Sequence, residues 1–250
     1  MIDDHCDVVV LTEVMQKKGA APGYDELRAQ LGEVWTGLRT LTPRPNTNSG
    51  NSEFYAVVYR KTFLETCEGW RELIFAVDGD GSDQASGPDV FLREPAFGCF
   101  RMRRTSGEFD FLLGAFHAKA RRGAQDRERT EAEARGLSRA LESVRKLRPG
   151  ENDVLIAGDF NLTPHELASA TRLIPLQKGG GSTLSASGGR SANLLDGFLL
   201  ESPALSPEVA SSAEVLDVRK YARNARTFAR TVSDHLPVRV LLRVVGPDDD

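Results

Sequence analysis

One short stretch, residues 154–164 (VLIAGDFNLTP), constrains the fold of this chain more than any other. An apolar run from Val154 to Ala157 predicts a buried strand, and the run stops at the sequence GDFN, which contains Asp159 and Asn161. A buried strand that ends on a carboxylate and a carboxamide presents oxygen ligands of the kind that Mg²⁺ binds. Asp and Asn are also common in turns, so the stretch alone leaves open an ordinary strand followed by a turn.

The composition of the chain is that of an ordinary globular protein. Its 250 residues are 40% hydrophobic and 27% charged. No apolar run approaches the roughly 18 residues that cross a bilayer, so we expect a soluble protein without a membrane partner. The net charge of −4 does not by itself indicate nucleic acid, which attracts basic proteins. An enzyme that cleaves a polyanion needs to be basic only locally.

The chain has only three cysteines, Cys6, Cys67 and Cys99. They are too few and too scattered to predict a disulfide framework, and their spacing matches no zinc site. The first residues also carry no signal-peptide pattern. This cysteine usage favours a reducing, intracellular compartment, although the sequence does not decide the localisation.

Several predicted strands begin or end at a residue able to bind a metal or move a proton. Such residues can meet at one edge of a sheet or at the facing edges of two. The group consists of Glu13 after strand 7–12, Glu53 before strand 54–60, His117 after strand 109–116, Asp196 within strand 193–200, and Asp234 and His235 before strand 236–244.

The remaining pattern alternates strands with helices and long loops. An apolar stripe at helical spacing, including Leu137 and Leu141, predicts a helix over residues 121–148. Strand pairs are predicted at 63–77 and at 95–116, and a strand is predicted within 232–245. Residues 178–191 form a Gly/Ser-rich loop that we expect to be mobile and able to close over a ligand. The alternation predicts one domain over residues 1–250: a four-layer α/β sandwich, with two mixed β-sheets face to face and helices outside.

Seven sequence blocks occur in the order and approximate spacing of a known family. They are LTEV (11–14), SEFYAVVYR (52–60), FLREPA (91–96), GAFHAK (114–119), AGDFNLTP (157–164), LLDGF (194–198) and SDHLPV (233–238). The chain thereby resembles the endonuclease/exonuclease/phosphatase family, most nearly its pancreatic-type deoxyribonuclease branch. The resemblance extends from about Asp7 to Leu242 and implies a deoxyribonuclease-like sandwich.

The resemblance implies a divalent metal site. Glu13 resembles the principal metal-binding carboxylate of the family, and Asp159 and Asn161 resemble the pair that holds the metal and the scissile phosphate. Asp234 would face the metal beside them. The implied ion is Mg²⁺ or Mn²⁺, since hard divalent cations prefer oxygen ligands.

The resemblance also implies two catalytic histidines, each oriented by a carboxylate. His117 would be held by Glu53, and His235 by Asp196. A carboxylate on one ring nitrogen fixes the tautomer and raises the pKa, which suits acid and base catalysis near neutral pH. We take His235 as the base and His117 as the acid. The sequence leaves the direction open, and in other branches an Asp placed like Asp196 is the base.

The function implied is Mg²⁺-dependent endonucleolytic hydrolysis of DNA, leaving 5′-phosphate and 3′-hydroxyl ends. The partner is then nucleic acid, with DNA expected before RNA, and the sequence does not separate endonuclease from exonuclease action. Two alternatives stay open. The same scaffold could hydrolyse smaller phosphate esters, such as inositol phosphates, sphingomyelin or 5′-tyrosyl DNA. It could also be a catalytically impaired scaffold or binding protein.

Three peripheral features have a functional and an ordinary interpretation. Arg93 resembles a phosphate contact of the deoxyribonuclease branch, or is a surface arginine at the start of a strand. Residues 78–89 resemble a structural Ca²⁺ loop with Asp80 and Asp89 as ligands (Asp78 being an alternative to Asp80), or are a solvated acidic loop. A further set of cations could line a phosphate track or simply be solvated: Arg101, Arg103, Arg104, Lys119 and Arg121.

The sequence departs from the family at its beginning. The family starts with a strand ending in a metal-site Asn, then a helix, and only then the strand that ends like Glu13. No segment before Asp7 can supply that first strand. Because buried unpaired backbone is costly, we expect either a truncated reading frame or another chain or rearranged segment in the slot. Reduced or absent activity is expected while the slot is open.

Overall fold

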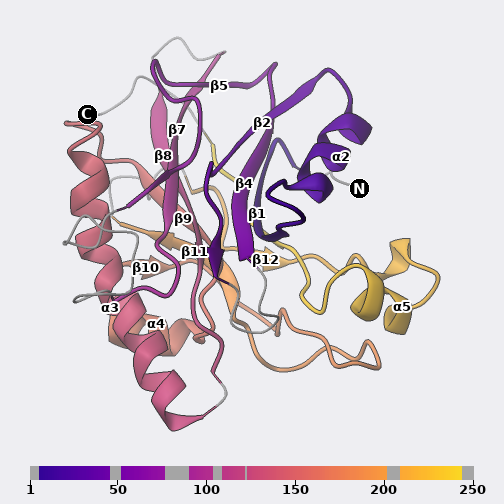
Figure 1. Cartoon of the computed structure of the whole chain (residues 1–250). Coiled ribbons are helices and arrows are strands. Elements are labelled where there is room, and N and C mark those ends of the chain that lie inside the picture. The colour runs from indigo at the N-terminus through magenta and orange to yellow at the C-terminus, as the bar shows by residue number, and fades with distance from the viewer. Residues whose placement is uncertain are drawn as a thin grey trace.

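The computed structural model describes residues 6–45, 52–76, 90–103, 109–121, 123–201 and 209–243. These residues form two β-sheets packed face to face, with helices against the outer faces (Figure 1). The predicted four-layer α/β sandwich is confirmed. The helices of the described residues are all too short or too polar to cross a membrane.

The smaller sheet is antiparallel throughout its described pairs. Its strands, in spatial order, are β1 (Val8–Met15), β4 (Ser52–Arg60) and β2 (Trp35–Arg39), with β3 (Arg44–Pro45) beside β4. Helix α2 (Pro22–Leu31) covers the outer face of this sheet, and it packs Tyr24 against Trp35, Phe54 and Val58.

The larger sheet is mixed. Its spatial order is β10 (Ile174–Pro175), β11 (Asp196–Leu200), β9 (Val154–Asp159), β8 (Asp110–His117), β7 (Ala96–Met102) and β5 (Leu64–Thr66), with β6 (Ile74–Phe75) also on β7. The predicted antiparallel pair β7–β8 is confirmed. The pair predicted within 63–77 is wrong, because β5 and β6 both pair with β7 instead of each other.

Strands β8 and β9 run parallel and are joined by helix α3 (Ala124–Arg145). Such a crossover is required between parallel neighbours. The apolar stripe predicted for this helix is buried on the outer face of the larger sheet, beside helix α4 (Pro164–Ala170). The apolar runs of β8 and β9 are buried on both faces, because α3 covers one face and the smaller sheet the other.

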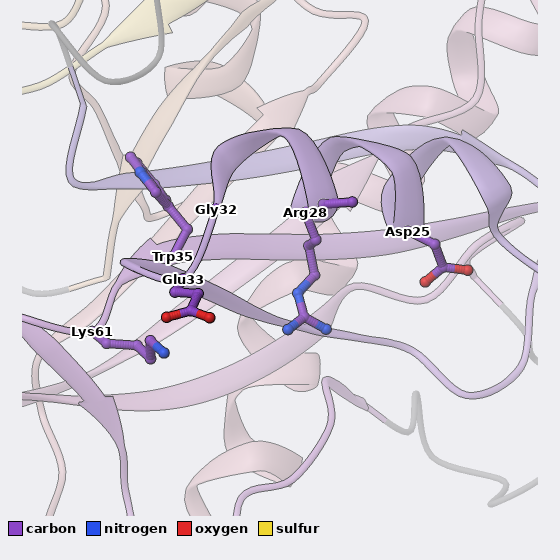
Figure 2. Close-up of a pocket in the computed structure, with 7 residues that line it drawn as sticks. Asp25, Arg28, Gly32, Glu33, Trp35 and Lys61 are labelled. Atoms are coloured by element: carbon purple, nitrogen blue, oxygen red, sulfur yellow. The ribbon is translucent and has the colours of Figure 1, made fainter.

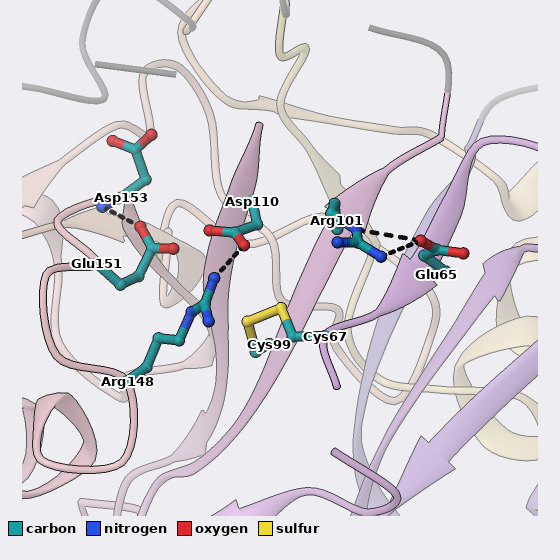
Figure 3. The surroundings of a disulfide bond; sticks show 8 residues. All are labelled: Glu65, Cys67, Cys99, Arg101, Asp110, Arg148, Glu151 and Asp153. Atoms are coloured by element: carbon teal, nitrogen blue, oxygen red, sulfur yellow. Dashed lines mark hydrogen bonds and ion pairs between the residues drawn. A yellow bond between two sulfur atoms is a disulfide. The ribbon is translucent and has the colours of Figure 1, made fainter. Parts of the chain in front are cut away.

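A disulfide joins Cys67 to Cys99 and corrects the prediction from cysteine usage. Cys99 lies on β7 and Cys67 directly follows β5, so the bond fastens the edge of the larger sheet (Figure 3). Both residues are buried. The pairing could not be read from the sequence because 32 positions separate the two residues and only strand pairing brings them together. Because two of the three cysteines form a disulfide, cysteine usage no longer favours a reducing compartment.

The C-terminal part contains short elements only. They are β12 (Glu214–Val215), the 3-10 helix η1 (Arg219–Tyr221), α5 (Ala225–Thr231) and β13 (Val238–Arg239). A long last strand was predicted here, but β13 has two residues and pairs with β12.

A groove of about 520 Å³ separates β1 from residues 236–242. Within the described ranges, β1 pairs with β4 alone, so its other edge faces this groove. Val8 to Leu11 are only partly buried, although an unbroken β-branched run is typical of a strand with neighbours on both sides. The groove also reaches Asp196 and His235.

Candidate active site

Three strand ends bring His117, Asp159 and Asp196 into one row across the larger sheet. His117 is paired with Asp159 in the parallel register of β8 and β9. Asp159 is paired with Asp196 in the antiparallel register of β9 and β11. The row follows from strand direction alone, because β8 and β9 end at the edge where β11 begins.

The backbone after β9 is shaped to present Asp159 and Asn161. A side chain at Gly158 would place its Cβ 1.8 Å from the carbonyl oxygen of Phe116, so only glycine allows β9 to lie this close to β8. Asn161 has a positive φ of 50°, which Asn tolerates better than most residues. The backbone N–H of Asn161 donates to Oδ1 of Asp159 (2.8 Å), and its side-chain Nδ2 donates to the Ala118 carbonyl (3.0 Å).

The smaller sheet contributes Glu13 and Glu53. An irregularity in the β1–β4 register lies between Leu11 and Val14, and Glu13 within it has a φ of 53°. Bulges of this kind redirect a side chain and are frequent beside active sites. Glu13 is thereby aimed at the larger sheet, with its Oε1 3.5 Å from Nε2 of His117.

Hydrogen bonds hold both the ring and the backbone of His117. Its Nδ1 donates to Oε1 of the buried Glu53 at 2.8 Å. This leaves Nε2 facing Glu13 and Asp159, whose nearer oxygens lie at 3.5 and 3.8 Å. The backbone N–H of His117 donates to the hydroxyl of Tyr55 (3.1 Å). The tautomer and direction of the imidazole are therefore fixed.

His235 forms the second histidine–carboxylate pair. Its Nδ1 donates to Oδ2 of Asp196 at 2.7 Å and lies 3.9 Å from Oδ2 of Asp159. Burial opposes protonation of His235. The bond to Asp196 and the charges of Asp196, Asp159 and Asp234 outweigh it and raise the pKa of His235 to about 9. The imidazole is thus protonated at neutral pH in the metal-free chain.

Asp159 lies near both histidines, and its own pKa is shifted from the ordinary value. Burial, and then the charge of Asp196, raise the pKa of Asp159 to about 6. A perturbed carboxylate between two oriented histidines is typical of a catalytic site. All of these groups come from positions that the sequence singled out.

The donor atoms suit a divalent cation. Two groups of possible ligands have their donor atoms within 4.8 Å of one another: Glu13 with Glu53 and His117, and Asp159 with Asp196 and His235. Carboxylate oxygens dominate both, as Mg²⁺ or Mn²⁺ requires. Glu13 and Asp159 belong to different groups, and Asp234 is exposed and belongs to neither, so the structure does not gather these three predicted metal ligands into one group.

Sequence reasoning missed Ser182, which orients Asp196. Its hydroxyl donates to Oδ2 of Asp196 (2.5 Å) and accepts from the backbone N–H of Asp196. The loop 178–191 was expected to be a mobile lid, but Ser182 is fully buried and its carbonyl accepts from Leu236. Nothing in the Gly/Ser pattern distinguishes this serine from its neighbours, because its role depends on contacts distant in sequence.

Arg93 lies beneath the site instead of on its surface. Its side chain is 2% exposed. Its Nε donates to the His117 carbonyl (2.9 Å) and its Nη2 to that of Ala118 (2.8 Å), and Nε lies 3.5 Å from Glu53. From the opposite side the buried Glu133 of α3 accepts the backbone N–H groups of Leu92 and Lys119. Both side chains anchor the loop that follows His117.

The predicted phosphate track consists of cations already paired with acids. Lys119 is paired with Asp126 and Arg121 with Glu166. Arg101 and Arg103 share Glu65. Arg104 and the candidate calcium ligands Asp80 and Asp89 lie outside the described residues.

A second cavity, of about 590 Å³, lies beside α2 (Figure 2). Its lining includes Asp25, Arg28, Glu33 and Lys61. Figure 2 shows side chains of both charges lining it. They balance one another, so the cavity has no charge preference for a ligand, and none of the site residues lines it.

A sequence model described as the Endonuclease/Exonuclease/phosphatase family matches residues 2–235. No curated protein sequence matches the chain significantly.

Solved structures with the same fold share little sequence with the chain. An endonuclease/exonuclease/phosphatase of Bacteroides vulgatus is 19% identical, with a TM-score of 0.64 over 98% of this chain and 87% of that one. A mannosyl-6-phosphatase of Bacteroides thetaiotaomicron is 18% identical (TM-score 0.62; 97% and 88% covered). D. rerio TDP2, complexed with a single strand DNA product, is 16% identical (TM-score 0.57; 96% and 86% covered).

Proposed function

The chain belongs to the endonuclease/exonuclease/phosphatase family, whose members are generally metal-dependent phosphoesterases, and we propose that it is a phosphodiesterase that cleaves DNA internally. The products would be 5′-phosphate and 3′-hydroxyl ends. One observation carries the proposal: two histidines, each held by its own carboxylate, lie 3.8 and 3.9 Å from the same oxygen of Asp159. An in-line displacement at phosphorus can use such a pair, one histidine as the base for water and the other as the acid for the leaving oxygen.

A divalent metal would be held by Glu13, Asp159 and the side-chain oxygen of Asn161. Nδ2 of Asn161 is engaged by the Ala118 carbonyl, so its amide oxygen is the atom directed away from that bond. When bound, Mg²⁺ or Mn²⁺ supplies charge neutralisation at a non-bridging phosphate oxygen. The role of Asp234 as a further ligand stays a prediction.

The two histidines would divide the proton transfers between them. We assign His235 as the base that takes a proton from water and His117 as the acid that protonates the leaving 3′ oxygen. Glu53 and Asp196 keep each ring in one tautomer and stabilise the imidazolium when it forms. The raised pKa of His235 in the metal-free chain favours the opposite assignment, and substrates with different leaving groups distinguish the two.

Support for DNA as substrate comes from the FLREPA and SEFYAVVYR blocks and from the complex of D. rerio TDP2 with a DNA product. A smaller phosphate ester is the second candidate, because the mannosyl-6-phosphatase has the same fold. A catalytically impaired scaffold is the third, motivated by the open edge of β1.

One titration separates these functions. Mg²⁺ and Mn²⁺ are titrated against supercoiled DNA, RNA, bis-p-nitrophenyl phosphate and a phosphomonoester, with the wild-type chain and His235→Ala. Turnover of DNA that the substitution abolishes supports the nuclease. Turnover of the monoester alone supports the smaller substrate, and equal background in both proteins contradicts an enzyme.

We further propose that an extended segment, from another chain or from elsewhere in this one, pairs with the open edge of β1. The apolar groove between β1 and residues 236–242 supports this, since an unpaired apolar edge strand attracts a further strand. Amide exchange at alternate residues of β1 would be fast in the isolated chain and slow once the segment is bound. Slow exchange along all of β1 in the isolated chain would contradict the proposal.

A further inference from the structure

A basic surface lies on the C-terminal part of the chain, over residues 219–230. The chain as a whole has a net charge of −4, yet this stretch contains no acidic residue. Its cations are Arg219, Lys220, Arg223, Arg226 and Arg230. A local reversal of charge of this kind is what a polyanion-binding enzyme with an acidic chain needs.

Helix α5 separates these cations from an apolar face. Arg226 and Arg230 are one turn apart and both exposed, while Phe228 between them is buried against Leu184, Val218 and Leu236. Arg223 precedes the helix by two residues and is also exposed. The helix therefore faces the protein with its aromatic residue and solvent with its arginines.

Three arginines of this surface have no acidic partner among the residues that the structure describes. In the described part of the chain, no acidic side chain forms an ion pair with Arg223, Arg226 or Arg230, and only Arg219 has an acid partner, Asp217. The cations near β8 contrast with them, since Lys119, Arg121, Arg101 and Arg103 are each paired. A free guanidinium is the group best suited to a phosphate.

The basic surface is attached directly to the catalytic loop. Only three residues separate the end of α5 at Thr231 from His235, so the two are at most about 14 Å apart. Leu236, next to His235, packs in the same cluster as Phe228. The backbone of Leu184, also in that cluster, donates to the Asp234 carbonyl (2.6 Å). Figure 1 shows α5 standing at one side of the sandwich.

We propose that residues 219–230 bind the sugar–phosphate backbone of a polynucleotide a few nucleotides from the scissile bond. The inference rests on the proposed phosphodiesterase function and names its substrate as a polymer. Phosphates of one strand are spaced about 3.4 Å along a duplex axis, so the near end of the surface, beside Thr231, lies within about four nucleotides of His235. Tyr221, 53% exposed and next to Lys220, offers a ring on which an unpaired base can stack.

The test compares two triple variants of the full chain. Arg223→Gln/Arg226→Gln/Arg230→Gln removes the basic surface. Arg129→Gln/Arg135→Gln/Arg139→Gln removes the same charge from exposed positions of α3. Binding of fluorescein-labelled 20-nucleotide DNA, single-stranded and duplex, is measured by anisotropy in EDTA at several salt concentrations. Turnover of bis-p-nitrophenyl phosphate is measured in Mg²⁺.

The basic-surface variant is expected to bind DNA at least about tenfold more weakly at low salt. The slope of log K against log salt should fall by about 2, since each lost phosphate contact lowers it by roughly 0.7–0.9. The α3 variant should bind like the wild type, and both should keep wild-type turnover of the small ester. Tyr221→Ala should weaken single-stranded DNA binding severalfold and leave duplex binding unchanged.

Wild-type DNA binding by the basic-surface variant, or equal losses in both triple variants, would overturn the proposal. So would binding to phosphatidylserine vesicles that depends on the same arginines while DNA binding does not. Failure of the proposed function is recognised separately: the wild type would then turn over no phosphodiester, while the anisotropy measurements would still report on the surface.

Discussion

At the scale of single residues, each catalytic group is oriented by a neighbour that the sequence places far away. Glu53 holds His117 from 64 positions away, and Asp196 holds His235 from 39. Each bond engages Nδ1 and so fixes the tautomer of its ring. The chemistry of the site therefore depends on the carboxylates Glu53 and Asp196 as much as on the histidines that they hold.

The assignment of acid and base predicts a split between substrates. A nitrophenolate leaves without protonation, whereas the 3′ oxygen of DNA needs an acid. His117→Ala should therefore lose about 10²–10⁴-fold activity on DNA and far less on bis-p-nitrophenyl phosphate, while His235→Ala should lose both alike. Rates on the two substrates at one pH decide it, and the reversed pattern would exchange the roles.

The pKa of His235 predicts a pH dependence of stability in the metal-free chain. A histidine whose folded pKa is about 9 and whose unfolded pKa is about 6.5 stabilises the fold fully below pH 6.5 and loses this contribution as pH rises through 9. The loss is up to about 3 kcal/mol. Urea unfolding in EDTA between pH 6.5 and 9.5 measures it. His235→Ala should flatten the curve, and an unchanged slope in that variant would refute the assignment.

At the scale of elements, parallel pairing of β8 and β9 positions the site, and the disulfide secures the far side of the same sheet. Helix α3 makes that parallel pair possible and also anchors the loop after His117 through Glu133. β7 carries Cys99 and pairs directly with β8. Stability at the sheet edge and geometry at the site are thus joined through neighbouring strands.

The disulfide predicts a measurable loss of stability on reduction. Opening a loop of 32 positions gives entropy back to the unfolded chain and costs about 3–4 kcal/mol in the chain-entropy estimate. Denaturant unfolding of the wild type with and without reductant, and of Cys67→Ala/Cys99→Ala, measures it. Cys6→Ala is the control: it keeps the bond, so it should lose as much stability on reduction as the wild type. Equal stability of oxidised and reduced wild type would contradict the bond.

At the scale of the whole molecule, one side of the site is buried between the two sheets, and the other side is exposed to solvent. Glu53, His117 and Asp159 are buried where both sheets contribute. Glu13 lies at the end of β1, beside the groove, and its side chain is 51% exposed. The Glu13 side of the site is therefore the more solvent-exposed part.

This asymmetry predicts low activity for the 250-residue chain by itself. An exposed Glu13 on a strand with an open edge holds a cation poorly, so plasmid cleavage should require millimolar Mg²⁺ and remain slow. Cleavage is followed on supercoiled DNA over a Mg²⁺ titration, with Glu13→Gln as the control. Efficient cleavage at micromolar Mg²⁺ would show that the open edge does not limit the enzyme.

The sequence by itself determined the longer strands β1, β4, β7, β8, β9 and β11, helix α3 and almost every member of the site. Apolar runs that stop at GDFN and at His117 mark buried strands and the residues at their ends, because burial and strand period are local properties. The family blocks added the pairing of each histidine with its carboxylate, and the structure contains both pairs.

Only the tertiary structure decided the features that join distant segments. The Cys67–Cys99 bond, the burial of Arg93 and the role of Ser182 depend on which backbones lie side by side. The open edge of β1 is decided in the same way, since an unbroken apolar run shows that a strand is suited to two neighbours and not whether both are present. Local composition sets what each segment can bury, and packing determines what it meets.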